Sequence, residues 1–191
     1  MKNTYSERSF IDACYYGEWK KVAMHIRHGA KPNQPDDRGY YPIHMACQEG
    51  HLKVVKILLK GGTDLGVKDD GEPVLLRAVG SGHLGVVKYL IKNGCDVNDR
   101  RINGGDTPLH IACGWGRFKE VVVLVAGGAN INALDDEKRS PVYYAVVKGH
   151  IDIVNFFIRN GYLKNARDKK TLLRIAIKNH DAKMIELLSC S

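Results

Sequence analysis

The sequence of 191 residues lacks several features that mark exported or membrane proteins. No run of about 18 apolar residues occurs, which is the length that a membrane-spanning helix needs, and the start MKNTYSERSF has no signal-peptide pattern. The five cysteines are an odd number without any Cys-x-x-Cys pair, and no Asn-x-Ser/Thr acceptor is present. We therefore expect a chain without disulfides or a transmembrane segment, located in the cytoplasm or also in the nucleus.

Signatures of catalysis are absent as well. The sequence has no GxxxxGK[ST], no GxGxxG after a strand, no HExxH and no GxSxG. The stretch GGDTPLHIACGWG (104–116) combines glycines with a histidine and a cysteine, so it raises the alternatives of a phosphate loop or a Cys/His nucleophile pair. No nucleophile and base can be placed together in one cleft. We predict a protein that is not an enzyme, with no catalytic residues, no cofactor and no metal.

What the chain does contain is a repeat. Hydrophobic residues make up 44% and charged residues 26%, with a net charge of +8, which is the balance of one folded globular domain. Alanines mark similar segments at steps of 33, 32, 34, 33 and 31 residues. A unit of about 33 residues therefore repeats along the whole chain. The register alanines are Ala13, Ala46, Ala78, Ala112, Ala145 and Ala176.

Each unit predicts two short helices and a turn. A proline at the second position of segments such as TPLHIA suits a helix start, where its missing N–H is not needed. A Gly-His pair then separates this helix from a second one, in which apolar residues recur at helical spacing, as in LKVVKILLK (52–60). We expect glycine C-caps at Gly61, Gly94, Gly127 and Gly161, followed by extended segments such as 96–98. Such small units must stack to bury their apolar faces.

The segments TPLHIA (107–112), GHLKVVKILLKGG (50–62) and GCDVN (94–98) resemble the ankyrin repeat, and the match covers nearly the entire chain. The resemblance implies a mainly α solenoid with β-hairpin-like finger loops, as a single domain over 1–191. Its expected units are 1–35 (N-cap), 36–67, 68–101, 102–134, 135–165 and 166–191 (C-cap). It also implies that Thr107 and His110 hydrogen-bond locally and bridge adjacent repeats.

Some positions depart from this pattern. Leu76 replaces the histidine of repeat three, which removes a hydrogen bond and suggests a softer middle. In the second helix of repeat four, Glu120 and Val122 stand where repeat two has Val54 and Lys56. That helix is therefore either slightly rotated or exposes an apolar spot. Cys14, Cys47 and Cys113 each follow a register alanine, so we expect them in the core.

Ankyrin repeats generally bind proteins through their finger tips and the concave face of the inner helices. The resemblance thus implies a protein-binding adaptor, scaffold or inhibitor, expected to be monomeric when alone and to take a basic or mixed-charge partner segment. The predicted partner-binding residues are Tyr15, Tyr16, Arg38, Tyr40, Gln48, Glu49, Asp69, Asp70, Glu72, Ser81, Asn103, Asp106, Trp115, Asp136, Glu137, Arg139, Lys148 and Lys178.

Trp115 is expected to be the energetic centre of this surface, since its column is otherwise polar and exposed tryptophans dominate interface hot spots. The alternative is that Trp115 folds over Tyr144 or another inner helix. Asn98 is a candidate for hydroxylation, because the spacing from Leu90 to Asn98 is similar to the segment that an asparaginyl hydroxylase of ankyrin repeats recognises. The alternative partner is nucleic acid or an anionic membrane, bound by lysines of the second helices: Lys53, Lys56, Lys60, Lys88 and Lys92.

Overall fold

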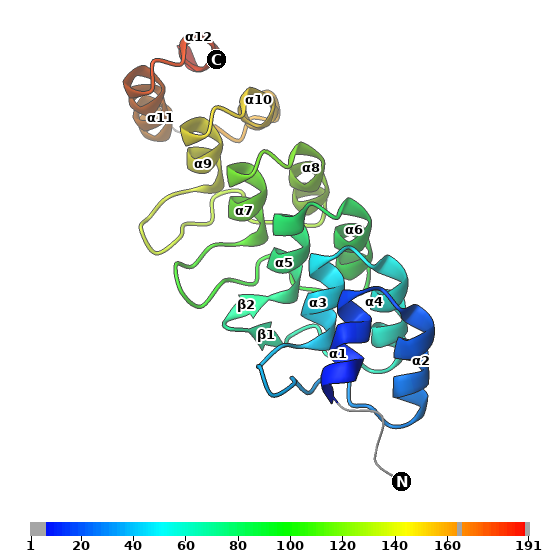
Figure 1. Cartoon of the computed structure of the whole chain (residues 1–191). Helices are drawn as coiled ribbons and strands as arrows, with labels where there is room; N and C mark the ends of the chain where they lie inside the picture. Colours follow the sequence, from blue (N-terminus) through cyan, green and yellow to red (C-terminus); the bar gives the residue numbers. More distant parts are fainter. Residues whose placement is uncertain (1–6, 164–165, 190–191) are drawn as a thin grey trace. The chain divides into compact units, whose positions relative to one another are not determined.

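The computed structural model describes residues 7–163 and 166–189, over which the chain forms twelve helices and one pair of short strands (Figure 1). The helices of the first half are α1 (Glu7–Tyr15), α2 (Trp19–Arg27), α3 (Pro42–Gln48), α4 (Leu52–Lys60), α5 (Val74–Ser81) and α6 (Leu84–Lys92). Strands β1 (Lys68–Asp69) and β2 (Glu72–Pro73) precede α5. The second half holds α7 (Pro108–Gly114), α8 (Phe118–Ala126), α9 (Pro141–Val147), α10 (Ile151–Arg159), α11 (Ala166–Lys178) and α12 (Ala182–Ser189).

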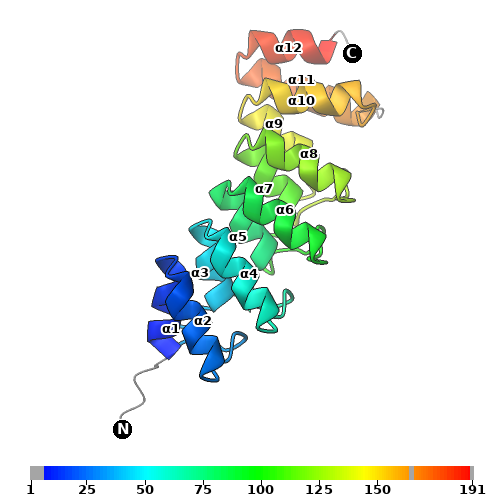
Figure 2. The same cartoon turned by 90° about the vertical axis from the view of Figure 1, so that its right-hand side faces the viewer.

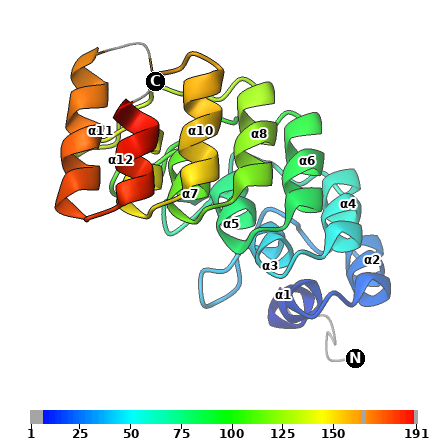
Figure 3. The same ribbon diagram turned by 90° about the horizontal axis from the view of Figure 1, so that it is seen from above.

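The chain forms two compact units, Met1–Ile102 and Asn103–Ser191. Within the first unit, α1, α3 and α5 pack in one row of inner helices, and α2, α4 and α6 pack in a second row of outer helices. The second unit repeats this arrangement, with α7, α9 and α11 as inner helices and α8, α10 and α12 as outer ones. The neighbouring outer helices α8 and α10 are seen side by side in Figure 3. One helix pair falls within each expected repeat, and the fold is mainly helical as predicted.

The inner helices begin where the sequence places proline. Pro42, Pro108 and Pro141 each occupy the first helical position, where a fixed φ suits the helix and no N–H partner is required. Repeat three differs, because Pro73 lies before the helix as its N-cap and α5 starts at Val74. The inner helices that start at these prolines are short, and almost every residue of α3 is buried.

The outer helices owe their stability to one apolar face. In α4, Val54, Val55 and Leu58 are fully buried, whereas the three lysines of the helix are exposed. Burying side chains of this size contributes about 1.5–3 kcal/mol each. The helix therefore depends on its neighbours for stability, since an isolated helix of nine residues is marginal in water.

The ends of the outer helices differ in part from the prediction. Gly61 and Gly127 are the C-cap residues of α4 and α8, as expected. The C-caps of α6 and α10 are instead Asn93 and Asn160. Each asparagine side chain donates a hydrogen bond to the carbonyl four residues earlier, at 2.7 and 2.8 Å. The expected caps Gly94 and Gly161 follow one residue later and have positive φ. They therefore terminate the helices from the position after the C-cap.

The finger loops contain little regular strand. Among the described residues, only β1 and β2 pair, antiparallel, around Asp70 and Gly71, which both have positive φ as a two-residue hairpin turn requires. The segment 96–98 forms no strand, contrary to the extended conformation predicted there. In two other fingers a buried aspartate organises the turn instead. Asp36 accepts backbone hydrogen bonds from Arg38 and Tyr40 at 3.0 Å, and Asp135 accepts one from Arg139 at 2.8 Å.

The second helix of repeat four keeps the register of its neighbours. Glu120 takes the buried position that Val54 occupies in α4 and is 5% exposed, while Val122 takes the exposed position of Lys56 and is 38% exposed. Of the two sequence-based alternatives, rotation is therefore wrong, and α8 exposes an apolar spot at Val122.

No helix in the described ranges is both long enough and apolar enough to cross a bilayer.

Candidate protein-interaction surface

The stretch GGDTPLHIACGWG builds a local hydrogen-bond network rather than a reactive centre. Nδ1 of His110 accepts a hydrogen bond from the backbone N–H of Thr107 at 3.1 Å and lies 2.8 Å from the Thr107 hydroxyl. Because Nδ1 is an acceptor, Nε2 carries the proton and donates to the carbonyl of Arg139 in the next repeat at 3.0 Å. The expected local bond and the bridge between repeats are both confirmed.

His44 makes the corresponding bridge in repeat two, where its Nε2 lies 3.0 Å from the carbonyl of Glu72. Tyr41 stands at the position of Thr107 there, and the buried Nδ1 of His44 has no hydrogen-bond partner among the residues that the structure describes. Burial lowers the pKa of His44 to about 4. Both imidazoles therefore serve as neutral structural groups, and Leu76, buried in repeat three, cannot make this bond.

A second set of histidines explains the Gly-His pairs. The Nε2 atoms of His51, His83 and His150 lie 2.9, 2.9 and 3.2 Å from carbonyls of the preceding inner helix, at Tyr15, Gln48 and Gly114. Each ring lies against a glycine of the preceding repeat. These glycines are Gly17, Gly50 and Gly116. A Cβ built on them would lie 2.6, 2.4 and 2.7 Å, respectively, from the nearest ring atom of the histidine. The glycine of one repeat is therefore required by the histidine of the next.

The cysteines of the inner helices lie in the core. Cys14, Cys47 and Cys113 are fully buried and free, and burial raises the pKa of each thiol. Raised thiol pKa values disfavour the reactive thiolate. Across residues 7–163 and 166–189, no three His, Cys, Asp or Glu side chains group as a metal ion would need.

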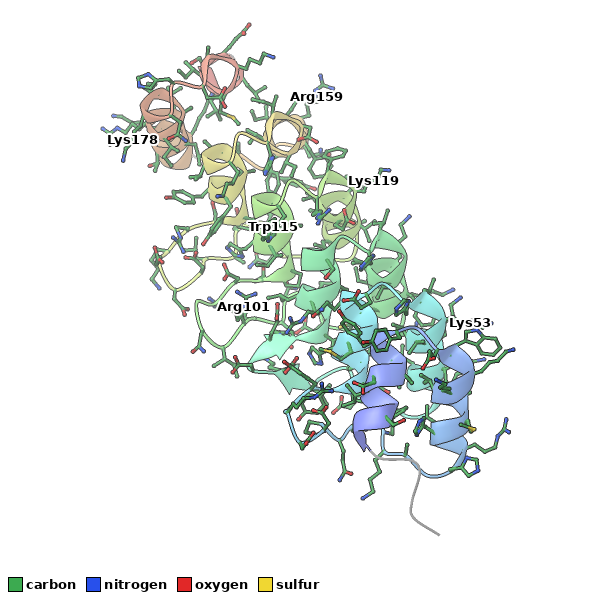
Figure 4. The ribbon with its side chains drawn as sticks, viewed as in Figure 1. Lys53, Arg101, Trp115, Lys119, Arg159 and Lys178 are labelled. Atoms are coloured by element: carbon green, nitrogen blue, oxygen red, sulfur yellow. The ribbon has the colours of Figure 1, made fainter. Side chains whose placement is uncertain are left out.

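Trp115 stands at the edge of a recess in the second unit. Its side chain is 67% exposed at the C-terminal end of α7 (Figure 4). The recess has a volume of about 470 Å³, and its surface is mostly apolar. We call it the Trp115 recess; it is lined by Asp106, His110, Ile111, Gly114, Trp115, Tyr144, Lys148 and His150. The indole is thus solvent-facing, and the alternative that it packs down over Tyr144 is wrong.

A second recess lies in the first unit and is more polar. It has a volume of about 320 Å³, and three tyrosines surround it. The rings of Tyr15 and Tyr16 meet edge to face at 5.1 Å, and the guanidinium of Arg38 stacks on Tyr40 at 5.2 Å. We call it the tyrosine recess; its lining is Ile11, Asp12, Tyr15, Tyr16, Arg38, Tyr40, Met45, Gln48, Asp69 and Arg77.

Arginines at the tyrosine recess are held by carboxylates. Arg38 pairs with the buried Asp36 at 2.7 Å and with Asp12 at 3.2 Å. Burial alone would raise the pKa of Asp36, but hydrogen bonds from Arg38 and Tyr40 outweigh it and lower that pKa. The fixed guanidinium presents a defined polar edge beside the tyrosine rings.

Asp69 is a correction to the predicted surface set. Its side chain was expected at an exposed finger tip, but the residue is only 6% exposed, because β1 turns it inward toward Arg77, 3.4 Å away. Burial raises the pKa of Asp69, and Arg77 partly opposes this shift. Arg77 also pairs with Glu72 at 2.8 Å, so the two acids position the arginine at the recess.

The recesses collect only part of the predicted residues. Tyr15, Tyr16, Arg38, Tyr40, Gln48 and Asp69 meet at the tyrosine recess, and Asp106, Trp115 and Lys148 meet at the Trp115 recess. The remaining residues lie outside both; those that are exposed are Asp70, Asn103, Asp136, Glu137 and Lys178, and those that are half-buried are Glu49, Glu72, Ser81 and Arg139. Asn98 is exposed, and its N–H bonds Asp96 at 2.8 Å. The binding role of all these residues stays a prediction.

Sequence reasoning missed one column of the surface. Both recesses are lined by the residues that directly precede a register alanine. These are Asp12, Met45, Arg77, Ile111 and Tyr144. The 33-residue period contained this signal, because residues at one position of a repeat face the same side. The predicted set instead contained residues of the finger tips and residues near the end of each inner helix.

Comparison with known proteins gives the family. The family model for ankyrin repeats (3 copies) matches residues 10–101 and 96–168. The chain belongs to the ankyrin-repeat family. Ankyrin repeats are general protein-protein interaction modules and are typically non-catalytic, so the recesses lie in a fold that is commonly used for binding proteins.

Three relatives of this ankyrin-repeat chain match it over only part of their own length. It is 30% identical to human neurogenic locus notch homolog protein 2 over 138 residues, which is 72% of this chain and 6% of that protein. It is 29% identical to the ankyrin repeat and KH domain-containing protein CBG24701 of Caenorhabditis briggsae over 173 residues, 90% of this chain and 6% of that protein. Mouse Rabankyrin-5 is 38% identical over 73 residues, 38% of this chain and 6% of that protein.

Proposed function

We propose that this ankyrin-repeat chain is a non-catalytic adaptor, scaffold or inhibitor that holds a segment of a partner protein on its inner helices and finger loops. The observation that carries the proposal is the indole of Trp115, which is 67% exposed beside a largely apolar recess. Tryptophan has a large apolar area and a single N–H donor, and such residues lose about 2 kcal/mol or more of binding when truncated. An indole held in solvent has no packing role to explain its presence.

The chemistry of the recess defines the partner segment. Ile111 and Tyr144 form apolar walls, and Lys148 provides an exposed cation at the rim. Asp106 adds a carboxylate to the lining. A volume of about 470 Å³ accommodates an aliphatic or aromatic side chain of the partner. The segment that fits best therefore presents one apolar anchor flanked by charges of both signs.

The non-catalytic part of the proposal rests on how the reactive groups are used. Both ring nitrogens of His110 are engaged in structural hydrogen bonds, and the Cys113 thiol is fully buried. A base whose lone pair is occupied and a nucleophile without access are unsuited to general base catalysis or nucleophilic attack.

The experiment uses the two tryptophans as a matched pair. The chain, its Trp115→Ala variant and a Trp19→Ala control are used as bait, and bound proteins are quantified by mass spectrometry. A partner captured by the chain is then purified and its Kd measured for all three. Trp115→Ala should weaken binding at least about tenfold, equivalent to about 1.4 kcal/mol, with little change in melting temperature, while Trp19→Ala should bind normally. Equal binding by Trp115→Ala would refute the central role of this residue, and a large loss of melting temperature would mean that Trp115 stabilises the fold.

A further inference from the structure

The outer helices of the first unit carry charge of one sign. Helices α2, α4 and α6 contain lysine and arginine but no aspartate or glutamate. They pack side by side, α2 on α4 and α4 on α6 (Figure 2). We call this surface the basic outer face; its cations, all exposed, are Lys20, Lys21, Arg27, Lys53, Lys56, Lys60, Lys88 and Lys92.

The second unit provides an internal comparison. Its outer helices have the same architecture, yet each carries one acid and one base among its described residues. They are Lys119 and Glu120 in α8, Asp152 and Arg159 in α10, and Lys183 and Glu186 in α12. Glu120 is buried, so the acids that reach the surface are those of α10 and α12. The repeat fold therefore does not require a face of one sign, and the basic outer face is a property of the first unit alone.

The cations of this face are mostly not consumed by internal ion pairs. Within the part of the chain that the structure describes, Lys21 alone among them forms one, with Glu18 at 2.7 Å. Lys53, labelled in Figure 4, lies over the ring of Trp19 at 3.3 Å. Like charges three or four residues apart on a helix repel each other. An anionic partner would relieve this repulsion.

The cations are arranged in rows across the face. Arg27, Lys60 and Lys92 occupy the same place in the last turn of α2, α4 and α6. Lys56 and Lys88 form a second row one turn earlier. Packed helices lie roughly 8–10 Å apart, so the rows form a two-dimensional array of positive charge that matches a plane of anions better than a single line of them.

Apolar groups lie within the array. Trp19 and Met24, both on α2, are 37% and 36% exposed among the lysines. Tryptophan is favoured at membrane–water interfaces, where its ring is half in an apolar environment and its N–H remains hydrated. Stacking of nucleic-acid bases on these rings fits less well, because ammonium groups already cover them. Lys53 lies over Trp19, and Lys56 lies over Tyr89 at 5.4 Å.

We propose that the basic outer face binds an anionic membrane surface. Clusters of four to eight basic residues on amphipathic helices are the pattern that attracts acidic lipid headgroups. The outer helices turn these cations away from the core that they build, whereas the two recesses are lined by inner helices and finger loops. The first unit can therefore rest on a bilayer by a surface that the protein-binding recesses do not use.

The test compares two triple variants in vesicle co-sedimentation. In the first, Lys56→Gln, Lys60→Gln and Lys88→Gln remove three cations from the basic outer face. The matched control, Lys119→Gln, Arg159→Gln and Lys183→Gln, removes one cation from each outer helix of the second unit. The unmodified chain should bind vesicles of phosphatidylcholine with phosphatidylserine and not phosphatidylcholine alone. Each lysine near such a surface contributes about fivefold to binding, so the first variant should bind on the order of a hundredfold more weakly.

The control variant should bind within about threefold of the unmodified chain, because the proposed contact with the membrane is made by the cations of the first unit. Equal binding to neutral and anionic vesicles, or an equal loss in both variants, would overturn the proposal. Tighter binding of labelled duplex DNA than of the anionic vesicles at the same salt would assign the face to nucleic acid instead. Melting curves of both variants check that they are folded.

Discussion

Replacing Gly50 by alanine tests the contact between glycine and histidine that joins neighbouring repeats. Gly50 has φ +74°, and a Cβ built there lies 2.4 Å from Nδ1 of the His83 ring. Alanine at positive φ costs about 1–2 kcal/mol. The ring must also move, which breaks its hydrogen bond to the carbonyl of Gln48 and adds about 1–3 kcal/mol if that carbonyl stays unsatisfied. We expect the free energy of unfolding to fall by about 2–5 kcal/mol in total.

Gly94 provides the matched control in the same unit. Its φ is +86°, and no atom lies within 4 Å of a Cβ built there. Gly94→Ala therefore carries the backbone cost without the collision, and we expect it to lose only about 1–2 kcal/mol. Urea unfolding followed by circular dichroism gives the free energy of unfolding for both variants.

A double-mutant cycle isolates the contact itself. In a His83→Ala background the ring is absent, so Gly50→Ala should cost no more than Gly94→Ala does. The coupling between Gly50→Ala and His83→Ala should then be at least about 1 kcal/mol, well above the roughly 0.5 kcal/mol scatter of independent sites. Additive effects within that scatter would refute the reasoning, because they would show that the ring does not require the glycine.

Three further predictions concern stability and modification. Although burial would raise the pKa of Asp135, hydrogen bonds from Tyr144 and Arg139 lower it to about 2 from the usual 3.8. Its contribution of about 2 kcal/mol to the free energy of unfolding is present above pH about 4 and is lost as the pH falls toward 2. Asp135→Asn should therefore destabilise the chain at neutral pH and make its unfolding less dependent on acid pH. An unchanged dependence on acid pH would contradict this. The first and last helix pairs have one neighbour instead of two, so hydrogen exchange should show them opening before repeats two to four, and uniform protection would count against it. Intact-mass spectrometry after incubation with an asparaginyl hydroxylase should show one added oxygen at Asn98; no gain there ends that hypothesis.

The repeat was predictable because each of its signals is local. Proline at the helix start, glycine before histidine and apolar residues at helical spacing each follow from backbone and packing chemistry within one unit. The bridge from His110 to Arg139 was expected only through the family resemblance, since no pairwise spacing in the sequence specifies a contact 29 residues away.

The wrong exposure expected for Asp69 arose from a side-chain contact that the sequence does not specify. Asp36 and Asp135 both begin an Asp-Asp pair, and in each pair the first aspartate is buried and the second exposed. The same inward turn of an acid explains Asp69, which composition alone places at an exposed tip. Which aspartate of a pair is buried depends on the arginine that its carboxylate contacts. That contact is formed only in the folded finger loop, so the sequence alone does not specify it.

The buried thiols allow the opening of individual repeats to be measured. Cys14, Cys47 and Cys113 lie in α1, α3 and α7, so each belongs to a different repeat, and none is exposed. An alkylating reagent can reach each sulfur only when its own repeat opens, so the rate at which each cysteine acquires a mass tag measures the opening of that repeat. The measurement needs no substitution in the chain. Partner or lipid binding that stabilises one repeat should slow the alkylation of the cysteine in that repeat and leave the alkylation rates of the other two unchanged.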